Sequence, residues 1–149
     1  MFQIVSEWLE NQTKEKTRNV FGNLFKIFWG WIESEGLFDS PEAMLRDYEQ
    51  RTGKQQYEHV KIIRRFMRWL KEQKEYSTNA RKVMLTCIKN FYAYNGTPLP
   101  KIQKSDLRAM LEPTEKEKRR HLEERPVKIE DLKATLMEAE EPYRTIFQV

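Results

Sequence analysis

Apolar residues recur at helical spacing along the first hundred residues of the chain. Between Thr17 and Glu35 they lie three and four residues apart, at Val20, Phe21, Leu24, Phe25, Ile27, Phe28, Trp31 and Ile32. This spacing places them on one broad face of a helix, and that face must be buried. Thr17 is the expected N-cap of the helix, and Gly36 is its expected stop.

The same pattern predicts further helices on both sides of this one. A short helix is expected ahead of it, from Phe2, Val5, Trp8 and Leu9. Ser40-Pro41-Glu42 combines a capping residue, a proline at the first helical position and an early acid, so a helix should begin there and close at Gly53. Two long helices follow, over residues 55–76 and 78–95. Because no period-2 run rich in Val, Ile or Thr occurs, the predicted fold class is all-α.

Each of the two long helices has an apolar and a polar side. The helix over 55–76 should bury Val60, Ile62, Ile63, Phe66, Met67, Trp69 and Leu70, and should expose Lys61, Arg64, Arg65, Arg68 and Lys71. The helix over 78–95 should bury Ala80, Val83, Met84, Cys87, Ile88, Phe91 and Tyr94. Its outer face would carry Asn79, Lys82, Thr86, Lys89 and Asn90, with Arg81 to one side.

Prolines at positions 98, 100, 113 and 126 punctuate a less apolar region. The almost wholly charged segment between the last two cannot bury enough surface to pack, so it is interpreted as a linker or solvent-bridging segment. We therefore expect a helical domain over 1–112, a charged linker over 113–126, and the first helices of a second, incomplete domain over 127–149. An apolar end without a cap, Ile146 to Val149, suggests that the chain is truncated.

Composition is that of an ordinary globular protein. With 149 residues and 39% hydrophobic content, the chain can bury a core without disulfides or metals. A single cysteine, Cys87, excludes an internal disulfide. There is no signal peptide and no run of 18 apolar residues, so we expect a cytoplasmic protein without membrane spans. No metal cluster or glycine-rich loop indicates a cofactor.

Positive charge is concentrated in the middle third of the chain. Residues 1–50 hold 5 Lys/Arg against 9 Asp/Glu, residues 51–100 hold 11 against 3, and residues 101–149 hold 11 against 11. A net charge of +8 over residues 51–100 favours a polyanion or an acidic partner. The alternative is a Lys/Arg-rich surface that contacts only solvent.

The start of the helix over 78–95 suits a phosphate. Unpaired backbone N–H groups, the positive end of the helix dipole and the short polar residues Ser77, Thr78 and Asn79 would meet there. Arg81 and Lys82 would add mobile positive charge. Asn and Arg can also hydrogen-bond purine edges in the major groove. The simpler alternative is an ordinary N-cap beside a solvated face.

These residues resemble a known family. Thr17-x-x-Val20-x-x-x-Leu24-x-x-x-Phe28-x-x-Trp31, a long helix from Tyr57 to Leu70, and Tyr76-Ser77-Thr78 leading to Ile88-Lys89-Asn90-Phe91-Tyr92-Ala93-Tyr94 are similar to the core-binding domain of tyrosine recombinases, the phage integrase family. Pro126 to Leu132 resembles the start of that family's catalytic domain. The resemblance covers nearly the whole chain.

The resemblance implies a small orthogonal helical bundle, called SAM-like, that clamps duplex DNA opposite a catalytic domain. Catalysis in the family uses an Arg, a Lys, a His-x-x-Arg, a further His or Trp, and a Tyr nucleophile. His59 and His121 are not followed by Arg three residues later, and Tyr76, Tyr92 and Tyr94 are interpreted as packing residues. This chain is therefore not expected to cut DNA by itself.

The resemblance nominates DNA contacts at the start of two helices: Lys14, Lys16 and Arg18 on the first, and Thr78, Asn79, Arg81 and Lys82 on the second. Charge alone adds Lys61, Arg64, Arg65, Arg68 and Lys89. The implied partners are double-stranded DNA, the parent catalytic domain and other recombinase protomers.

Two alternatives of other classes stay open. One is a non-catalytic helical adaptor that docks a protein partner through the apolar segment Tyr143 to Val149. The other is an enzyme of unknown type, which the absence of clustered acids or a Cys/His pair disfavours.

Overall fold

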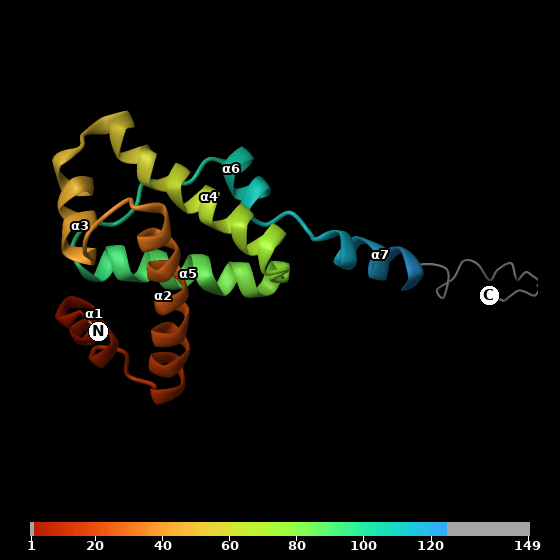
Figure 1. Ribbon diagram of the computed structural model, residues 1–149, viewed down its shortest axis with the longest axis horizontal. Coiled ribbons are helices and arrows are strands. Elements are labelled where there is room, and N and C mark those ends of the chain that lie inside the picture. The colour runs from red at the N-terminus through yellow and green to blue at the C-terminus, as the bar shows by residue number, and fades with distance from the viewer. Residues whose placement is uncertain (1, 125–149) are drawn as a thin grey trace, which may run out of the picture. The chain divides into compact units, whose positions relative to one another are not determined.

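The computed structural model describes residues 2–124, which form helices joined by turns (Figure 1). The chain divides into two compact units, Met1–Glu112 and a second unit that begins at Pro113. Over the described residues no strand occurs, which confirms the all-α fold class. The helices predicted over 127–149, the motif from Pro126 to Leu132 and the apolar segment Tyr143 to Val149 lie outside the described residues.

The first unit contains six α-helices and one short 3-10 turn. They are α1 (Gln3–Glu10), α2 (Glu15–Glu35), α3 (Pro41–Gln50), η1 (Gly53–Gln56), α4 (Tyr57–Gln73), α5 (Thr78–Tyr94) and α6 (Lys104–Met110). The described part of the second unit contains α7 (Glu115–Glu124).

Most of the predicted helix ends are confirmed. Gly36 follows α2 in the left-handed conformation, with φ of 66°, and the N–H of Leu37 bonds back to the carbonyl of Ile32. The Ser40 and Ser77 side chains cap α3 and α5 by accepting from the backbone N–H three residues on. Two predictions were wrong. Thr17 lies inside α2, which begins two residues earlier, and Gly53 opens η1 after α3 has already ended.

The core of the first unit forms where α2 crosses α5 (Figure 1). The Trp8 ring lies 5.6 Å from Phe25 and 5.1 Å from Phe91 between centroids, while Phe25 and Phe91 lie 4.6 Å apart. Nearby, Cys87 Sγ on α5 donates to the Phe21 carbonyl oxygen on α2 at 3.7 Å. Burial raises the pKa of the Cys87 thiol to about 12, so the thiol stays protonated and unreactive while the bundle is folded.

A buried histidine joins three of the helices. His59 on α4 is 1% exposed; its Nε2 lies 2.7 Å from Asp47 Oδ2 on α3, and its Nδ1 lies 2.8 Å from the Tyr92 hydroxyl on α5. Because an ionised carboxylate can only accept, Nε2–H donates to Asp47 and Nδ1 accepts from Tyr92. Burial lowers the pKa of His59, and the Asp47 carboxylate only partly opposes this, so the ring is neutral at pH 7.

The predicted buried face of α5 was partly wrong. Val83 and Tyr94 are 44% and 43% exposed, whereas Leu85 and Tyr92 are buried. Arg81, expected at the side of the helix, is 0% exposed. The assignment failed because it sorted side chains by polarity and therefore placed Arg81 outside the buried face. In the fold Arg81 has hydrogen-bond partners and is buried, so the inward face of the helix includes it.

The segment predicted as a charged linker contains a helix. Thr114 and Glu117 form a reciprocal capping box before α7: the Glu117 N–H donates to Thr114 Oγ1 at 3.1 Å, and the Thr114 N–H donates to Glu117 Oε1 at 2.9 Å. Leu122 on α7 is 57% exposed, so capping and pairs such as Lys118–Glu115 stabilise this helix rather than apolar burial. Helix α6 was also not predicted, because its seven residues are too few to show a helical period.

Candidate nucleic-acid interface

The turn between α1 and α2 lies against the second half of α5. Asn90 Oδ1 on α5 accepts from the Trp8 indole N–H at 2.8 Å and from Gln12 Nε2 at 3.3 Å. In turn, Arg18 Nη2 on α2 donates to the Gln12 carbonyl oxygen at 3.2 Å. These contacts connect the α1–α2 turn and the first turn of α2 with the outer face of α5 at Asn90, and together they form one surface.

This surface carries positive charge that the fold does not use. Lys14, Lys16, Lys82 and Lys89 are exposed, and none of them forms an ion pair with any residue in 2–124. We call the set of these four lysines with Arg18, Thr86 and Asn90 the α2–α5 surface. Glu15 is the acid within its first helical turn, so the local balance stays positive.

Asn90 is a polar side chain of this surface that its neighbours orient. Its Oδ1 is used by two donors from α1 and the following turn, while its Nδ2 has no hydrogen-bond partner among residues 2–124. The amide therefore has two N–H donors available on the outer side of α5. Sequence reasoning placed Asn90 on that face but gave no signal that Trp8 would fix it.

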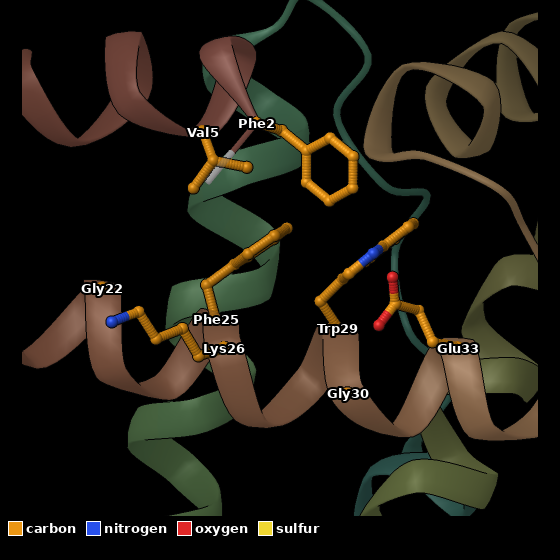
Figure 2. A pocket seen from close by; sticks show the side chains of 8 residues that line it. All are labelled: Phe2, Val5, Gly22, Phe25, Lys26, Trp29, Gly30 and Glu33. Atoms are coloured by element: carbon orange, nitrogen blue, oxygen red, sulfur yellow. The ribbon is translucent and has the colours of Figure 1, made fainter.

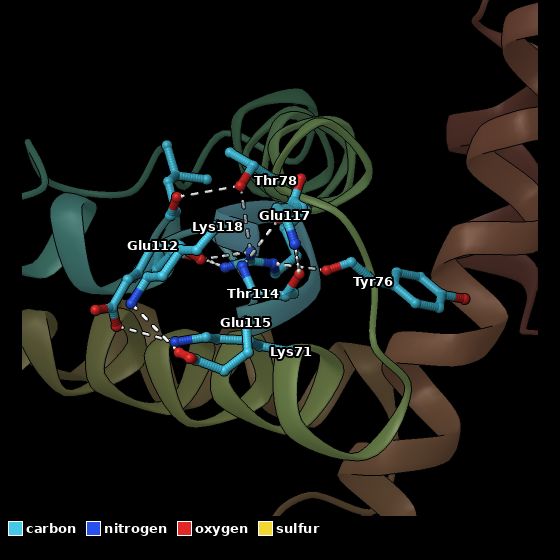
Figure 3. A network of polar contacts seen from close by, with 11 residues as sticks. Lys71, Tyr76, Thr78, Glu112, Thr114, Glu115, Glu117 and Lys118 are labelled. Atoms are coloured by element: carbon cyan, nitrogen blue, oxygen red, sulfur yellow. Dashed lines mark hydrogen bonds and ion pairs between the residues drawn. The ribbon is translucent and has the colours of Figure 1, made fainter. Parts of the chain in front are cut away.

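Arg81 does not belong to this surface, and its nomination as a DNA contact was wrong. Its Nη1 donates to the Met110 carbonyl oxygen at 2.6 Å, its Nη2 to the Glu112 carbonyl oxygen at 2.6 Å, and its Nε to the Tyr76 carbonyl oxygen at 3.2 Å. Figure 3 shows Tyr76, Thr78 and Glu112 around this network. The guanidinium thus ties the start of α5 to the end of α6 and cannot reach a phosphate.

Thr78 takes part in the same network, while Asn79 remains exposed. Thr78 Oγ1 accepts from Arg81 Nη2 at 3.4 Å and donates to the Leu111 carbonyl oxygen at 3.5 Å. Its hydroxyl is therefore occupied within the fold. Asn79 lies exposed at the first turn of α5, where the helix dipole is positive.

The basic residues of α4 are in a different situation. Three of the four nominated cations are ion-paired: Lys61 with Glu58 at 3.2 Å, Arg64 with Asp106 at 2.7 Å, and Arg65 with Glu35 at 2.8 Å. Lys71, on the same face, pairs with Glu112 at 2.9 Å. Arg68 is exposed and forms no ion pair within residues 2–124.

The partners of the α4 arginines come from other parts of the chain. Glu35 ends α2, and Asp106 lies in α6, where its carboxylate also accepts from the Tyr57 hydroxyl at 2.5 Å. The Arg65 guanidinium additionally lies 5.7 Å above the Trp31 ring. These cations hold α2 and α6 against α4, so most of the predicted basic face is compensated charge.

Residues 2–124 offer neither a metal site nor a membrane span. Within them no group of three His, Cys, Asp or Glu side chains is placed to hold a metal ion. No helix in this part of the chain is long and apolar enough to cross a membrane.

Comparison with known proteins returns no relative. No family model, no curated protein and no solved structure matches this chain.

Proposed function

We propose that this chain is the DNA-binding module of a tyrosine recombinase, a SAM-like bundle that holds duplex DNA through the α2–α5 surface. The supporting observation is the group of four exposed lysines without ion pairs in residues 2–124, Lys14, Lys16, Lys82 and Lys89, beside an oriented Asn90. Such a group attracts a polyanion, because none of its lysines is ion-paired with a carboxylate of the described residues.

Lysine and asparagine have different roles in the proposed binding. Lysines act as mobile point charges toward phosphates and position the duplex without reading its sequence. Asn90 offers two N–H donors on the outer side of α5, and a major groove about 12 Å wide admits one helix. Base contacts would therefore come from Asn90 and Asn79, and phosphate contacts from the lysines.

Strand cleavage is assigned to a part of the recombinase that this chain does not supply. Neither histidine is followed by the arginine of a His-x-x-Arg motif. Tyr92 is buried and bonded to His59, and burial raises the pKa of its hydroxyl, so it is not a nucleophile. The catalytic domain and further protomers on DNA are the proposed protein partners.

Duplex binding titrated over a series of salt concentrations tests this function. For the wild-type chain, log affinity should fall linearly with log salt concentration because each neutralised phosphate releases counterions. Lys82→Gln with Lys89→Gln should reduce the steepness of that line by roughly 2, because each substitution removes one cation that neutralises a phosphate.

The matched control removes two cations from α4 instead. Arg64→Gln with Arg65→Gln should leave the salt dependence unchanged, because those charges are already paired. If the α4 pair flattens the line and the α5 pair does not, the contact surface is on α4. A correctly folded chain, checked by circular dichroism, that ignores duplex DNA in dilute buffer would end the proposal.

A further inference from the structure

Gly30 occupies a position in α2 that the fold of this chain does not explain. It lies in the interior of a 21-residue helix, where glycine destabilises the helix relative to alanine. It is exposed, and a Cβ added there would meet no atom within 4 Å. No contact among residues 2–124 therefore requires glycine, whereas close approach of another backbone would.

A groove of about 320 Å³ runs beside Gly30 between α1 and α2 (Figure 2). Phe2, Val5, Phe25 and Trp29 make its lining apolar. Trp29 Nε1 is buried and has no hydrogen-bond partner among residues 2–124, which is rare for a buried donor. The apolar lining and the unsatisfied donor both indicate a face whose packing this chain alone does not complete.

Two opposite charges line this groove. Lys26 and Glu33 line it on either side of Gly30, as Figure 2 shows, and neither forms an ion pair within residues 2–124. They are seven residues apart, which is two helical turns or about 10 Å along one face. Their midpoint falls between Trp29 and Gly30.

We infer that this face binds a second copy of the chain, with two α2 helices packed antiparallel about a two-fold axis. In such a pair Lys26 faces the partner's Glu33, and Glu33 faces the partner's Lys26, so one arrangement satisfies four charges. The same symmetry places the axis beside Gly30. The point where the two backbones come closest is thus the exposed position of α2 that has no side chain.

The dimer does not compete with the proposed DNA contacts and does not rest on them. Lys14 and Arg18 precede Gly30 by twelve to sixteen residues, which is roughly 18–24 Å along α2. The crossing point of the proposed dimer therefore lies in the second half of α2, away from the DNA contacts proposed in its first turn.

Sedimentation velocity of the full chain without DNA, from micromolar to millimolar concentration, tests the inference. The wild-type chain should show a concentration-dependent monomer–dimer equilibrium. Gly30→Leu fills the crossing point while improving helix propensity, so it should abolish the dimer and leave the helical circular dichroism signal intact. Lys26→Glu and Glu33→Lys each create two like-charge pairs, and each should weaken association about tenfold or more.

The decisive variant combines both reversals. Lys26→Glu with Glu33→Lys restores opposite-charge pairs only if residue 26 of one copy faces residue 33 of the other, so the double variant should dimerise like the wild type. Glu49→Lys, an exposed reversal on α3 away from the groove, should change nothing. A wild-type chain that stays monomeric overturns the inference, and so does a dimer that ignores these variants or is not rescued by the double reversal. Since DNA is absent throughout, either result leaves the proposed DNA contacts to their own test.

Discussion

Helices α4 and α5 are both 17 residues long and both carry several cations, but the fold uses the two sets differently. On α4 the arginines at 64 and 65 pair with Asp106 and Glu35. On α5 the outward lysines at 82 and 89 pair with no described residue. Counting charges along the chain therefore finds the cations, but the charge left after pairing decides where a polyanion can bind.

The same contrast occurs between two adjacent residues. Arg81 is fully buried and donates to three backbone carbonyl oxygens, while Lys82 is exposed without an ion partner in residues 2–124. Arg81 therefore contributes to folding stability, whereas Lys82 remains available at the surface. Substitutions test that division, beginning with the largest expected effect.

Arg81→Leu should destabilise the chain by about 3 kcal/mol or more, because the buried carbonyl oxygen of Met110 and the part-buried carbonyl oxygen of Glu112 lose a charged donor. Urea unfolding followed by circular dichroism measures this. Lys82→Leu is the neighbouring control and should change stability by no more than about 0.5 kcal/mol. Equal losses in the two variants would show that burial does not separate their roles.

Stability should fall on acidification because of His59, which lies on the buried face of α4. Because burial lowers the pKa of His59 below its ordinary 6.5, the unfolded chain takes up the proton first. The contribution is fully present above pH 6.5 and declines below it, by at most about 1.4 kcal/mol per pH unit. Unfolding curves recorded between pH 7.5 and 5, at intervals of about one pH unit, measure the slope of the free energy of unfolding against pH.

Substitution of the buried ring supplies the control for that slope. His59→Gln should remove most of the pH dependence, because it removes the group whose pKa burial lowers. Asp47 does not titrate between about pH 7.5 and 5. Burial raises its pKa, but hydrogen bonds from Arg51 and His59 outweigh that effect and hold the pKa below its ordinary 3.8. Its contribution is lost only as the pH falls below that value.

Arg64→Gln should cost about 1 kcal/mol, since Asp106 is largely buried while Arg64 is partly screened by solvent. Thermal unfolding measures the loss, and duplex affinity should not change. Arg68→Gln, on the same helix but without an ion partner in residues 2–124, should leave stability unaltered. A fall in DNA affinity for Arg64→Gln would show that α4 contributes to the DNA interface.

The smallest effect is expected at an ion pair whose two side chains are both exposed. The Arg65 and Glu35 side chains are 55% and 38% exposed, so Arg65→Gln should change stability by less than about 1 kcal/mol, and less still in high salt. Matched melting curves in low and high salt test this. A large loss at high salt would mean that stacking on Trp31, and not charge, is the main role of Arg65.

Local chemistry explains which parts of this architecture could be predicted. A cap or a stop acts within one turn of chain, so Ser40, Ser77 and Gly36 could be assigned from their neighbours alone. Thr114 and Glu117 carry the spacing of a capping box, but a segment so rich in charge buries little surface, and this favoured a linker over a helix. Amphipathic spacing predicted most of the buried face of α4 and only part of the buried face of α5.

The candidate site was less predictable because its contacts are long-range. Nothing near Arg81 in sequence indicates that the carbonyl oxygens about thirty residues later will surround its guanidinium. Likewise, the acid that pairs with Arg65 lies about thirty residues before it, and the acid that pairs with Arg64 lies about forty residues after it. Each of these contacts forms only when distant helices pack, so polarity and charge counts could not reveal them.

The sequence by itself determined that the chain is helical, where most helices begin and end, and which third of the chain is basic, because caps, apolar periodicity and charge are properties of a few neighbouring residues. The tertiary structure alone decided which cations remain available. An ion pair or a buried guanidinium depends on distances between helices, and it removes from the surface a charge that the sequence counts in full.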